Sequence, residues 1–345
     1  MKPEVAILAV GLIAVPAAAW PQEPGRPGSF REEARVERVI VDAYVVDRSG
    51  DPIPDLSVTD FRVRVDGRPV ELESAEWIPA DLPELPVAGG LLGGPPVQAA
   101  PGRLIVFFFQ TDYEPSRLVG LVRMSLQARR FLETLLPSDR VAVVSYDSHL
   151  KLRQDFTDDR AKLETAIHDA IRTGTSEEPI RIEHPSVAKH FDFAAARHAY
   201  TPEAGLFVLA RALTRIPGGK TMLYFGWGLG TIGGIGGPNF AERRDFRSAL
   251  RSLAAARVSI FTLDVTDADY HSLEGSLQDV SDLTGGIYQK THIFANLAMD
   301  RVRRAISGRY VLVFKAPEGP RGQHTIEVRL SSRKGEVNAR QYYDD

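Results

Sequence analysis

The chain has 345 residues, a formal net charge of −3 and no cysteine. Without cysteine, neither a disulfide nor a lipid-modified cysteine can hold an exported chain, and the small negative charge excludes the basic surface of nucleic-acid-binding proteins. With 43% hydrophobic and 25% charged residues the composition is that of an ordinary globular protein, and the length predicts about two domains.

Residues 1–19 have the pattern of a secretory signal peptide. Lys2 gives a positive start, residues 5–15 are apolar, and residues 16–19 supply the small side chains that a signal peptidase needs. The apolar stretch is shorter than the roughly 20 residues that span a bilayer, so an uncleaved membrane anchor is the weaker alternative. We therefore expect a secreted or periplasmic protein that has no membrane span after cleavage.

A disordered leader at 20–33 and a small all-β unit at 34–79 are predicted next. Residues 38–46 are rich in Val, Ile and Tyr, and residues 61–65 alternate between apolar and charged side chains, as in a strand with one solvated face. Asp66-Gly67 then indicates a hairpin, with residues 70–77 as the returning strand. Residues 80–102 are rich in Pro and Gly and are predicted to form a linker.

From residue 103 to 307, buried strands alternate with helices. Residues 104–109 are an unbroken apolar run, as expected for a strand that is buried on both faces of a parallel sheet. Further strands are predicted at 141–146, 150–153, 222–225, 258–263 and 287–289, and helices at about 118–135, 240–255, 272–283 and 293–306. Thr157, which precedes two aspartates, and Thr201, which precedes Pro202, are predicted to cap two more helices. This order predicts an α/β fold with a doubly wound, mainly parallel, Rossmann-like sheet.

The pattern returns to β in residues 308–345. Three antiparallel strands are predicted at 310–314, 324–330 and 337–343, separated by turns rich in Gly and Pro or in charge. Two arrangements are open: these strands pair with those of residues 34–79 in one sandwich-like unit, or they form a separate element.

Most of the mature sequence resembles the VWFA-related domain of secreted bacterial proteins, within the von Willebrand factor type A (vWA) family. The matching stretches are residues 41–47 with Gly50, Leu56 with 60–61, 140–144, 154–159, 259–264, 283–286, 310–312 and 340–343. Each stretch alone is weak, and their order and spacing carry the resemblance. It implies a vWA domain at 103–307 with β additions at both ends.

The resemblance also implies a divalent-cation site, the metal-ion-dependent adhesion site, at the carboxyl edge of the sheet. The family holds Mg²⁺, which prefers about six oxygen ligands, with Asp-x-Ser-x-Ser after the first strand and with a threonine and an aspartate from other loops. Here the motif is degenerate, because Gln110 stands at the first position and the loop after the fourth strand has no carboxylate. A shift of two residues gives Asp112, Glu114 and Ser116, with Thr201 as the candidate threonine. A bound Mg²⁺ or other divalent cation is one hypothesis, and simple helix caps are the other.

Two further motifs suggest other chemistry. Residues 228–233 match G-x-G-x-x-G after a strand, but more glycines follow instead of a helix, so a flexible loop is favoured over a dinucleotide site. In the polar insertion at 173–201, His190, Asp192 and His198 are candidate metal ligands, although solvated surface residues are the simpler interpretation. The common signs of acyl-transfer catalysis are missing from the sequence.

The carboxyl ends of the strands are predicted as the recognition surface, because ligands of open α/β sheets bind there. The predicted rim consists of Gln110, Thr111, Asp147, Ser148, Gly226, Trp227, Gly228 and Asp264. We expect a secreted vWA-domain protein that binds another protein in adhesion or in the cell envelope, and that is not an enzyme. The alternatives are a nucleotide-binding enzyme that uses the glycine-rich loop at 226–238, and a structural component of an envelope assembly.

Overall fold

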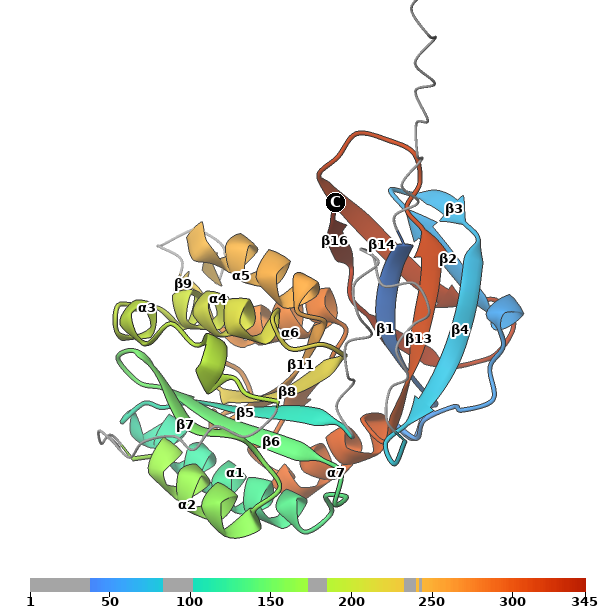
Figure 1. The fold of residues 1–345 in the computed structure, drawn as a ribbon. Helices are drawn as coiled ribbons and strands as arrows, with labels where there is room; N and C mark the ends of the chain where they lie inside the picture. Colours follow the sequence, from blue (N-terminus) through green and yellow to red (C-terminus); the bar gives the residue numbers. More distant parts are fainter. Residues whose placement is uncertain (1–37, 83–101, 173–184, 233–239, 242–243) are drawn as a thin grey trace, which may run out of the picture. The chain divides into compact units, whose positions relative to one another are not determined.

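The computed structural model describes residues 38–82, 102–172, 185–232, 240–241 and 244–345 (Figure 1). The predicted signal peptide, the leader, nearly all of the linker and part of the polar insertion lie outside these residues. The domain boundaries given above stay predictions. Among the described residues, no helix is long and apolar enough to cross a membrane.

A six-stranded sheet forms the centre of the α/β region. Its strands are β5 (Leu104–Gln110), β6 (Arg140–Tyr146), β7 (Leu150–Thr157), β8 (Lys220–Gly226), β11 (Val258–Asp264) and β12 (Tyr288–Lys290). They lie in the order β12-β11-β8-β5-β6-β7. All neighbours pair in parallel except β7, which runs antiparallel to β6 at the edge. The predicted fold class, a doubly wound and mainly parallel sheet, is confirmed.

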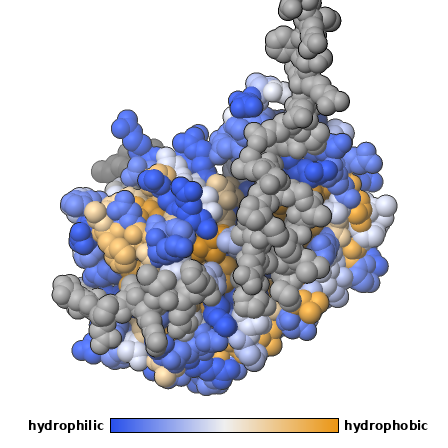
Figure 2. Space-filling view, viewed as in Figure 1, coloured by the Kyte–Doolittle hydropathy of each residue, from blue (hydrophilic) through white to orange (hydrophobic). Residues whose placement is uncertain are grey.

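Helices cover both faces of this sheet (Figure 1). One face packs against α1 (Pro115–Leu132), α2 (Arg160–Ala170) and α7 (Ala295–Ala305), and the other against α3 (Phe193–Arg197), α4 (Pro202–Leu213), α5 (Arg244–Ala255) and α6 (Glu274–Thr284). Successive side chains of a strand point to opposite faces, so Phe107 packs with the first group and Phe108 with the second. Both are fully buried, which explains the unbroken apolar run. On the surface, apolar residues gather over α3 and α4, where Phe193 is 46% exposed (Figure 2).

Several element boundaries differ from the sequence prediction. Thr157 is not a helix cap but the last residue of β7, and Asp159 caps α2 by accepting the N–H groups of Ala161 and Lys162. A carboxylate two residues further on satisfies the free N–H groups as well as a hydroxyl does. Phe240–Ala241, the predicted start of a helix, instead form the short strand β10, which pairs with β9 (Thr231–Ile232) in the glycine-rich segment. The predicted cap at Thr201 is confirmed, because its hydroxyl accepts the N–H of Ala204 at 3.1 Å.

Two four-stranded antiparallel sheets combine strands from both ends of the described chain. The N-terminal elements are β1 (Arg38–Val46), η1 (Val58–Asp60), β2 (Phe61–Val65), β3 (Arg68–Val70) and β4 (Leu72–Pro79), and the C-terminal ones are β13 (Gly308–Lys315), β14 (Gln323–Leu330), β15 (Glu336–Ala339) and β16 (Tyr342–Asp344). The sheet orders are β15-β1-β13-β4 and β16-β14-β2-β3. Apolar side chains from both sheets form one core cluster. The arrangement left open above is therefore decided in favour of one sandwich-like unit.

The β unit is joined to the start of the α/β strands by buried polar contacts. The carboxylate of Asp42 on β1 accepts from Arg257, just before β11, at 2.7 and 2.9 Å, and from Arg309 on β13 at 2.9 Å. The hydroxyl groups of Tyr44 and Thr221 lie 3.0 Å apart, the latter on β8. The β unit is thus fixed at the amino ends of β8 and β11, on the opposite edge from their carboxyl ends.

The buried His324 on β14 predicts a pH dependence of stability. Its Nδ1 lies 2.7 Å from Asp66 and its Nε2 3.3 Å from Asp345, and the hydrogen bond with Asp66 raises the pKa of His324 above its usual 6.5. A raised pKa in the folded state means that this stabilisation is complete below about pH 6.5 and is lost as the pH rises through the raised pKa. We expect wild type to have a higher Tm than His324→Gln, and we expect this Tm difference to be larger at about pH 5.5 than at about pH 8.5.

Thermal unfolding followed by circular dichroism over this range measures the difference. The control is His168→Gln, because His168 is exposed and pairs with its neighbour Asp169 on the surface of α2. A Tm difference between wild type and His324→Gln that is constant with pH contradicts the prediction.

Candidate functional site

The predicted rim residues lie at the ends of four adjacent parallel strands. Gln110, Gly226 and Asp264 are the last residues of β5, β8 and β11, and Asp147 follows the last residue of β6. Backbone hydrogen bonds tie the trailing loops together, since Val265 donates to the carbonyl of Gly226 at 2.9 Å. The rim is therefore one continuous edge of the sheet.

Gln110 is a buried link between the end of β5 and the loop after β8. Its side-chain N–H donates to the carbonyl of Gly228 at 2.8 Å, and its side-chain oxygen accepts from the N–H groups of Trp227 and Gly228 at 3.0 and 3.3 Å. An aspartate or glutamate offers no N–H for the first of these bonds. These contacts with the loop after β8 explain why an amide stands at position 110, where the motif has a carboxylate.

The four candidate metal ligands have protein partners. Glu114 caps α1 by accepting the N–H of Arg117 at 3.3 Å, and it also accepts the hydroxyl of Ser116. Asp112 forms an ion pair with the guanidinium of Arg117, while Thr201 caps α4. Among the described residues, no group of three or more His, Asp or Glu side chains is arranged to hold a metal ion.

Arg117 also contacts the loop after β8, a role that the sequence does not reveal. Its guanidinium carbon lies 3.7 Å from the centre of the Trp227 ring, in a cation–π contact. Burial by itself raises the pKa of Asp112, but the hydrogen bond and the charge of Arg117 outweigh this effect and lower that pKa. The loops after β5 and β8 are therefore joined by an arginine.

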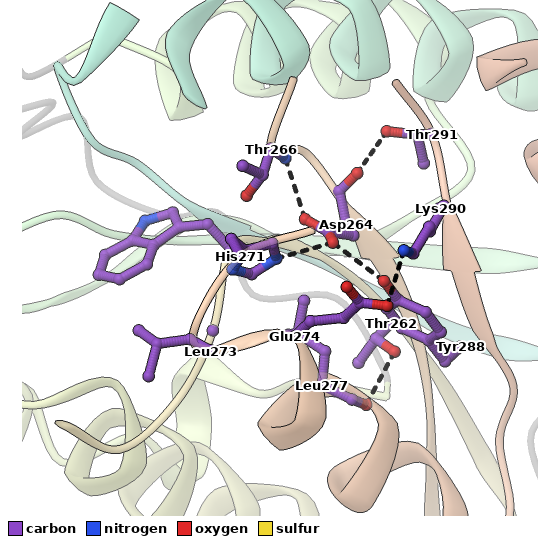
Figure 3. Close-up of polar contacts among 12 residues, drawn as sticks. Thr262, Asp264, Thr266, His271, Leu273, Glu274, Leu277, Tyr288, Lys290 and Thr291 are labelled. Carbon is purple, nitrogen blue, oxygen red and sulfur yellow. Dashed lines mark hydrogen bonds and ion pairs between the residues drawn. The ribbon is translucent and has the colours of Figure 1, made fainter. Parts of the chain in front are cut away.

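Asp264, at the end of β11, is the centre of a second polar network (Figure 3). This buried carboxylate accepts from the N–H of Thr266 at 3.0 Å and the hydroxyl of Tyr288 at 3.0 Å, and it lies 2.8 Å from Nε2 of His271. Burial and the charge of Asp264 raise the pKa of Tyr288, which keeps it a neutral donor. Glu274 pairs with Lys290 of β12 at 2.9 Å in the same view.

This network orders the long loop after β11. Asp264 holds the start of the loop through Thr266 and its end through His271, and α6 has no side-chain cap. Two further carboxylates of this loop bind outside it, because Asp267 pairs with Arg123 and Asp269 with His292. Asp264 is thus a structural anchor of the rim.

Exposed apolar and aromatic side chains mark the same edge. Tyr113 in the loop after β5 is 60% exposed, Tyr270 in the loop after β11 is 63% exposed, and Phe294 before α7 is 60% exposed. Tyr200, which precedes the N-cap of α4, is 71% exposed. Sequence reasoning misses these residues, because a tyrosine in a loop has the same local pattern whether it is covered or exposed.

In the glycine-rich loop, the N–H groups of residues 227–230 are already bonded within the protein. The N–H groups of Trp227 and Gly228 donate to Gln110, that of Leu229 to Ser276, and that of Gly230 to Glu203. A phosphate-binding loop must present such groups to its ligand. These described residues therefore lack the donors that a dinucleotide requires, and residues 233–238 lie outside the described part.

In the polar insertion, the candidate metal ligands serve local structure. Asp192 caps α3 by accepting the N–H of Ala195 at 2.9 Å, and Nδ1 of His198 lies 2.8 Å from the carbonyl of Ala194. His190 ends the short η2 (Ala188–His190).

No family model and no curated protein matches the sequence. Solved structures of similar fold include a von Willebrand factor type A protein from Catenulispora acidiphila, at 10% identity over 85% of this chain and 76% of that chain, with a TM-score of 0.40. These structural neighbours are vWA-fold proteins. A second neighbour is the type V pili tip protein Mfa5 from Porphyromonas gingivalis, at 12% identity over 90% of this chain and 68% of that chain, with a TM-score of 0.40. A third is proximal thread matrix protein 1 from the mussel byssus, with a zinc-occupied MIDAS motif (11% identity, 61% and 47% coverage, TM-score 0.37).

The likeness of the sequence to the vWA family stays a resemblance, because these structures are at most 12% identical to the chain and their TM-scores lie below 0.5. At such identities the likeness concerns the fold alone.

Proposed function

We propose that the chain is an exported vWA-fold binding module, and not an enzyme, whose carboxyl edge recognises another protein. The observation that carries this proposal is the exposure of Tyr113, Tyr270 and Phe294 on separate loops of one edge. Tyrosine is enriched among the residues that dominate protein–protein binding energy, because it buries a large rigid surface and keeps a hydrogen-bonding hydroxyl.

The contacts beneath these side chains support the proposal. The ion pair of Arg117, the amide of Gln110 and the network of Asp264 hold the loops in place before any partner binds. A surface that is ordered in advance loses less conformational entropy on association, which favours affinity. Adhesion or assembly in the cell envelope fits an exported chain, and export is proposed from residues 1–19.

Site-specific photo-crosslinking in the exporting cell tests the proposed surface. A photoreactive amino acid at Tyr113 or Tyr270 is expected to give the same cross-linked protein partner. The control is Glu133, an exposed residue after the last turn of α1, at the opposite edge of the sheet. The same product from Glu133, or no protein product from either tyrosine, refutes the proposal.

Once the partner is identified by cross-linking, the contribution of each tyrosine to the binding free energy can be measured. We expect Tyr270→Ala to weaken binding at least about 30-fold, which corresponds to about 2 kcal/mol for a residue at the centre of an interface. Surface plasmon resonance with purified partner measures the change, and Tyr270→Phe separates the ring from its hydroxyl. Unchanged affinity in both Tyr113→Ala and Tyr270→Ala contradicts the assignment of the rim.

A further inference from the structure

At the carboxyl edge of β5, the positive charge is supplied by the protein itself. Arg117 lies in the first turn of α1, and its guanidinium contacts the carboxylate of Asp112 and the face of the Trp227 ring. The side chains of Arg117 and Asp112 are only 27% and 28% exposed, so solvent screens the ion pair incompletely.

We infer that the guanidinium of Arg117 supplies the positive charge at this edge. The loops of the rim are then held in a binding-competent arrangement without a divalent metal ion. The vWA resemblance implies a metal that links the loops after the first and fourth strands. In this chain the equivalent link runs from Asp112 through Arg117 to Trp227. This inference rests on the proposed function, because it explains how the loops of the proposed recognition surface are held together.

The side-chain oxygen atoms around Arg117 do not fit the coordination of a divalent ion. Mg²⁺ requires about six oxygens in near-octahedral geometry, usually with one or two carboxylates free to bind it. The carboxylate of Asp112 is neutralised by Arg117, and that of Glu114 accepts from both Ser116 and the backbone. Gln110 uses both ends of its amide on the loop after β8. A metal would therefore have to displace existing contacts and also approach a guanidinium of like charge.

The surrounding loops fit around Arg117 with their own hydrogen bonds. The N–H of Asp267, in the loop after β11, donates to the carbonyl of Ser116 at 3.0 Å, and Asp112 accepts the N–H of Glu114 at 3.1 Å. The side chain of Arg117 thus contacts the loops after β5 and β8, and the loop after β11 bonds to the backbone of the preceding residue. We therefore assign Arg117 as a positioning residue and not as a contact with the partner.

Metal titration of the wild-type protein tests this inference without any partner. Any ligand that binds the native state raises Tm by mass action. We expect the same Tm in millimolar MgCl₂, in millimolar MnCl₂ and in EDTA, and no heat of binding for MnCl₂ in calorimetry. A saturable rise of the wild-type Tm with either ion overturns the inference.

Variants of Arg117 provide the second arm of the test. Arg117→Met removes the charge and the cation–π contact and is expected to lower Tm by about 2–4 °C. Arg117→Lys restores the charge but not the planar stacking, so an intermediate Tm is expected. The matched control is Arg123→Met on the same helix, because Arg123 also joins loops of this edge, through its 3.4 Å pair with Asp267 and its 2.6 Å hydrogen bond to the carbonyl of His292.

Trp227 gives a readout that general destabilisation does not move. In the folded protein, well below Tm, Arg117→Met is expected to change the tryptophan emission spectrum, while Arg123→Met leaves it as in wild type. Equal Tm values and equal spectra for Arg117→Met and Arg123→Met overturn the inference. Because these measurements need no partner, a failure here is distinguishable from a failure of the proposed binding function.

Discussion

Replacing Asp42 by alanine is expected to lower the free energy of unfolding by about 3–5 kcal/mol, because it removes a buried carboxylate that pairs with two largely buried arginines. Its side chain is 8% exposed, and those of Arg257 and Arg309 are 18% and 13% exposed. Burial by itself raises the pKa of Asp42, but the two guanidinium groups outweigh it and hold this pKa well below its usual value. The carboxylate is therefore charged at neutral pH.

Urea unfolding followed by circular dichroism measures this loss. Asp42→Asn keeps the shape of the side chain without the charge, and we expect it to be destabilised as well. The control is Asp51→Ala, because Asp51 is 52% exposed and its pair with Arg304 is a surface ion pair, worth at most about 1 kcal/mol. Equal stabilities of the Asp42 and Asp51 variants would contradict the prediction.

The second large effect is expected for Gly120→Ala in the middle of α1. A Cβ atom at this position would lie 1.7 Å from the carbonyl oxygen of Val265, the residue after β11. The backbone of Val265 is held by its hydrogen bond to Gly226, so the helix has to move instead. Alanine favours a helix over glycine by about 1 kcal/mol, but overpacking against backbone exceeds this gain.

We expect a net loss of at least about 2 kcal/mol in the free energy of unfolding for Gly120→Ala. Because α1 carries Arg117 in its first turn, weaker binding of the proposed partner is expected as well. Gly319→Ala is the matched control, since nothing lies within 4 Å of a Cβ atom there. Denaturant titration of both variants checks the prediction, and a Gly120→Ala protein as stable as Gly319→Ala disproves it.

The elements of the fold are predictable from the sequence where the signal is local. A strand buried on both faces needs an apolar side chain at every position, so the run that becomes β5 is recognisable by itself. Thr201 followed by Pro202 indicates a helix start by the same local logic. Thr157 is a failure of this logic, because a threonine before two aspartates suits both the end of a strand and a cap.

The candidate site is predictable only in part. The end of each parallel strand locates the rim, and Gln110, Gly226 and Asp264 lie there as the sequence suggests. The partners of these side chains are not predictable, because Gln110 binds Gly228, and Arg117 binds Trp227, only when β5 and β8 are neighbours. The exposure of Tyr113 and Tyr270 is equally a property of the packed loops.

The sequence by itself determined the alternation of strands and helices, the β segments at both ends and the departure of residues 110–116 from the metal-binding motif. These features depend on contacts between residues that are near in the chain, where spacing and side-chain type are sufficient. Only the tertiary structure decided that the two β segments share sheets and that an arginine joins the loops after β5 and β8. Those outcomes depend on which strands become neighbours, and that choice is made by packing of the whole core.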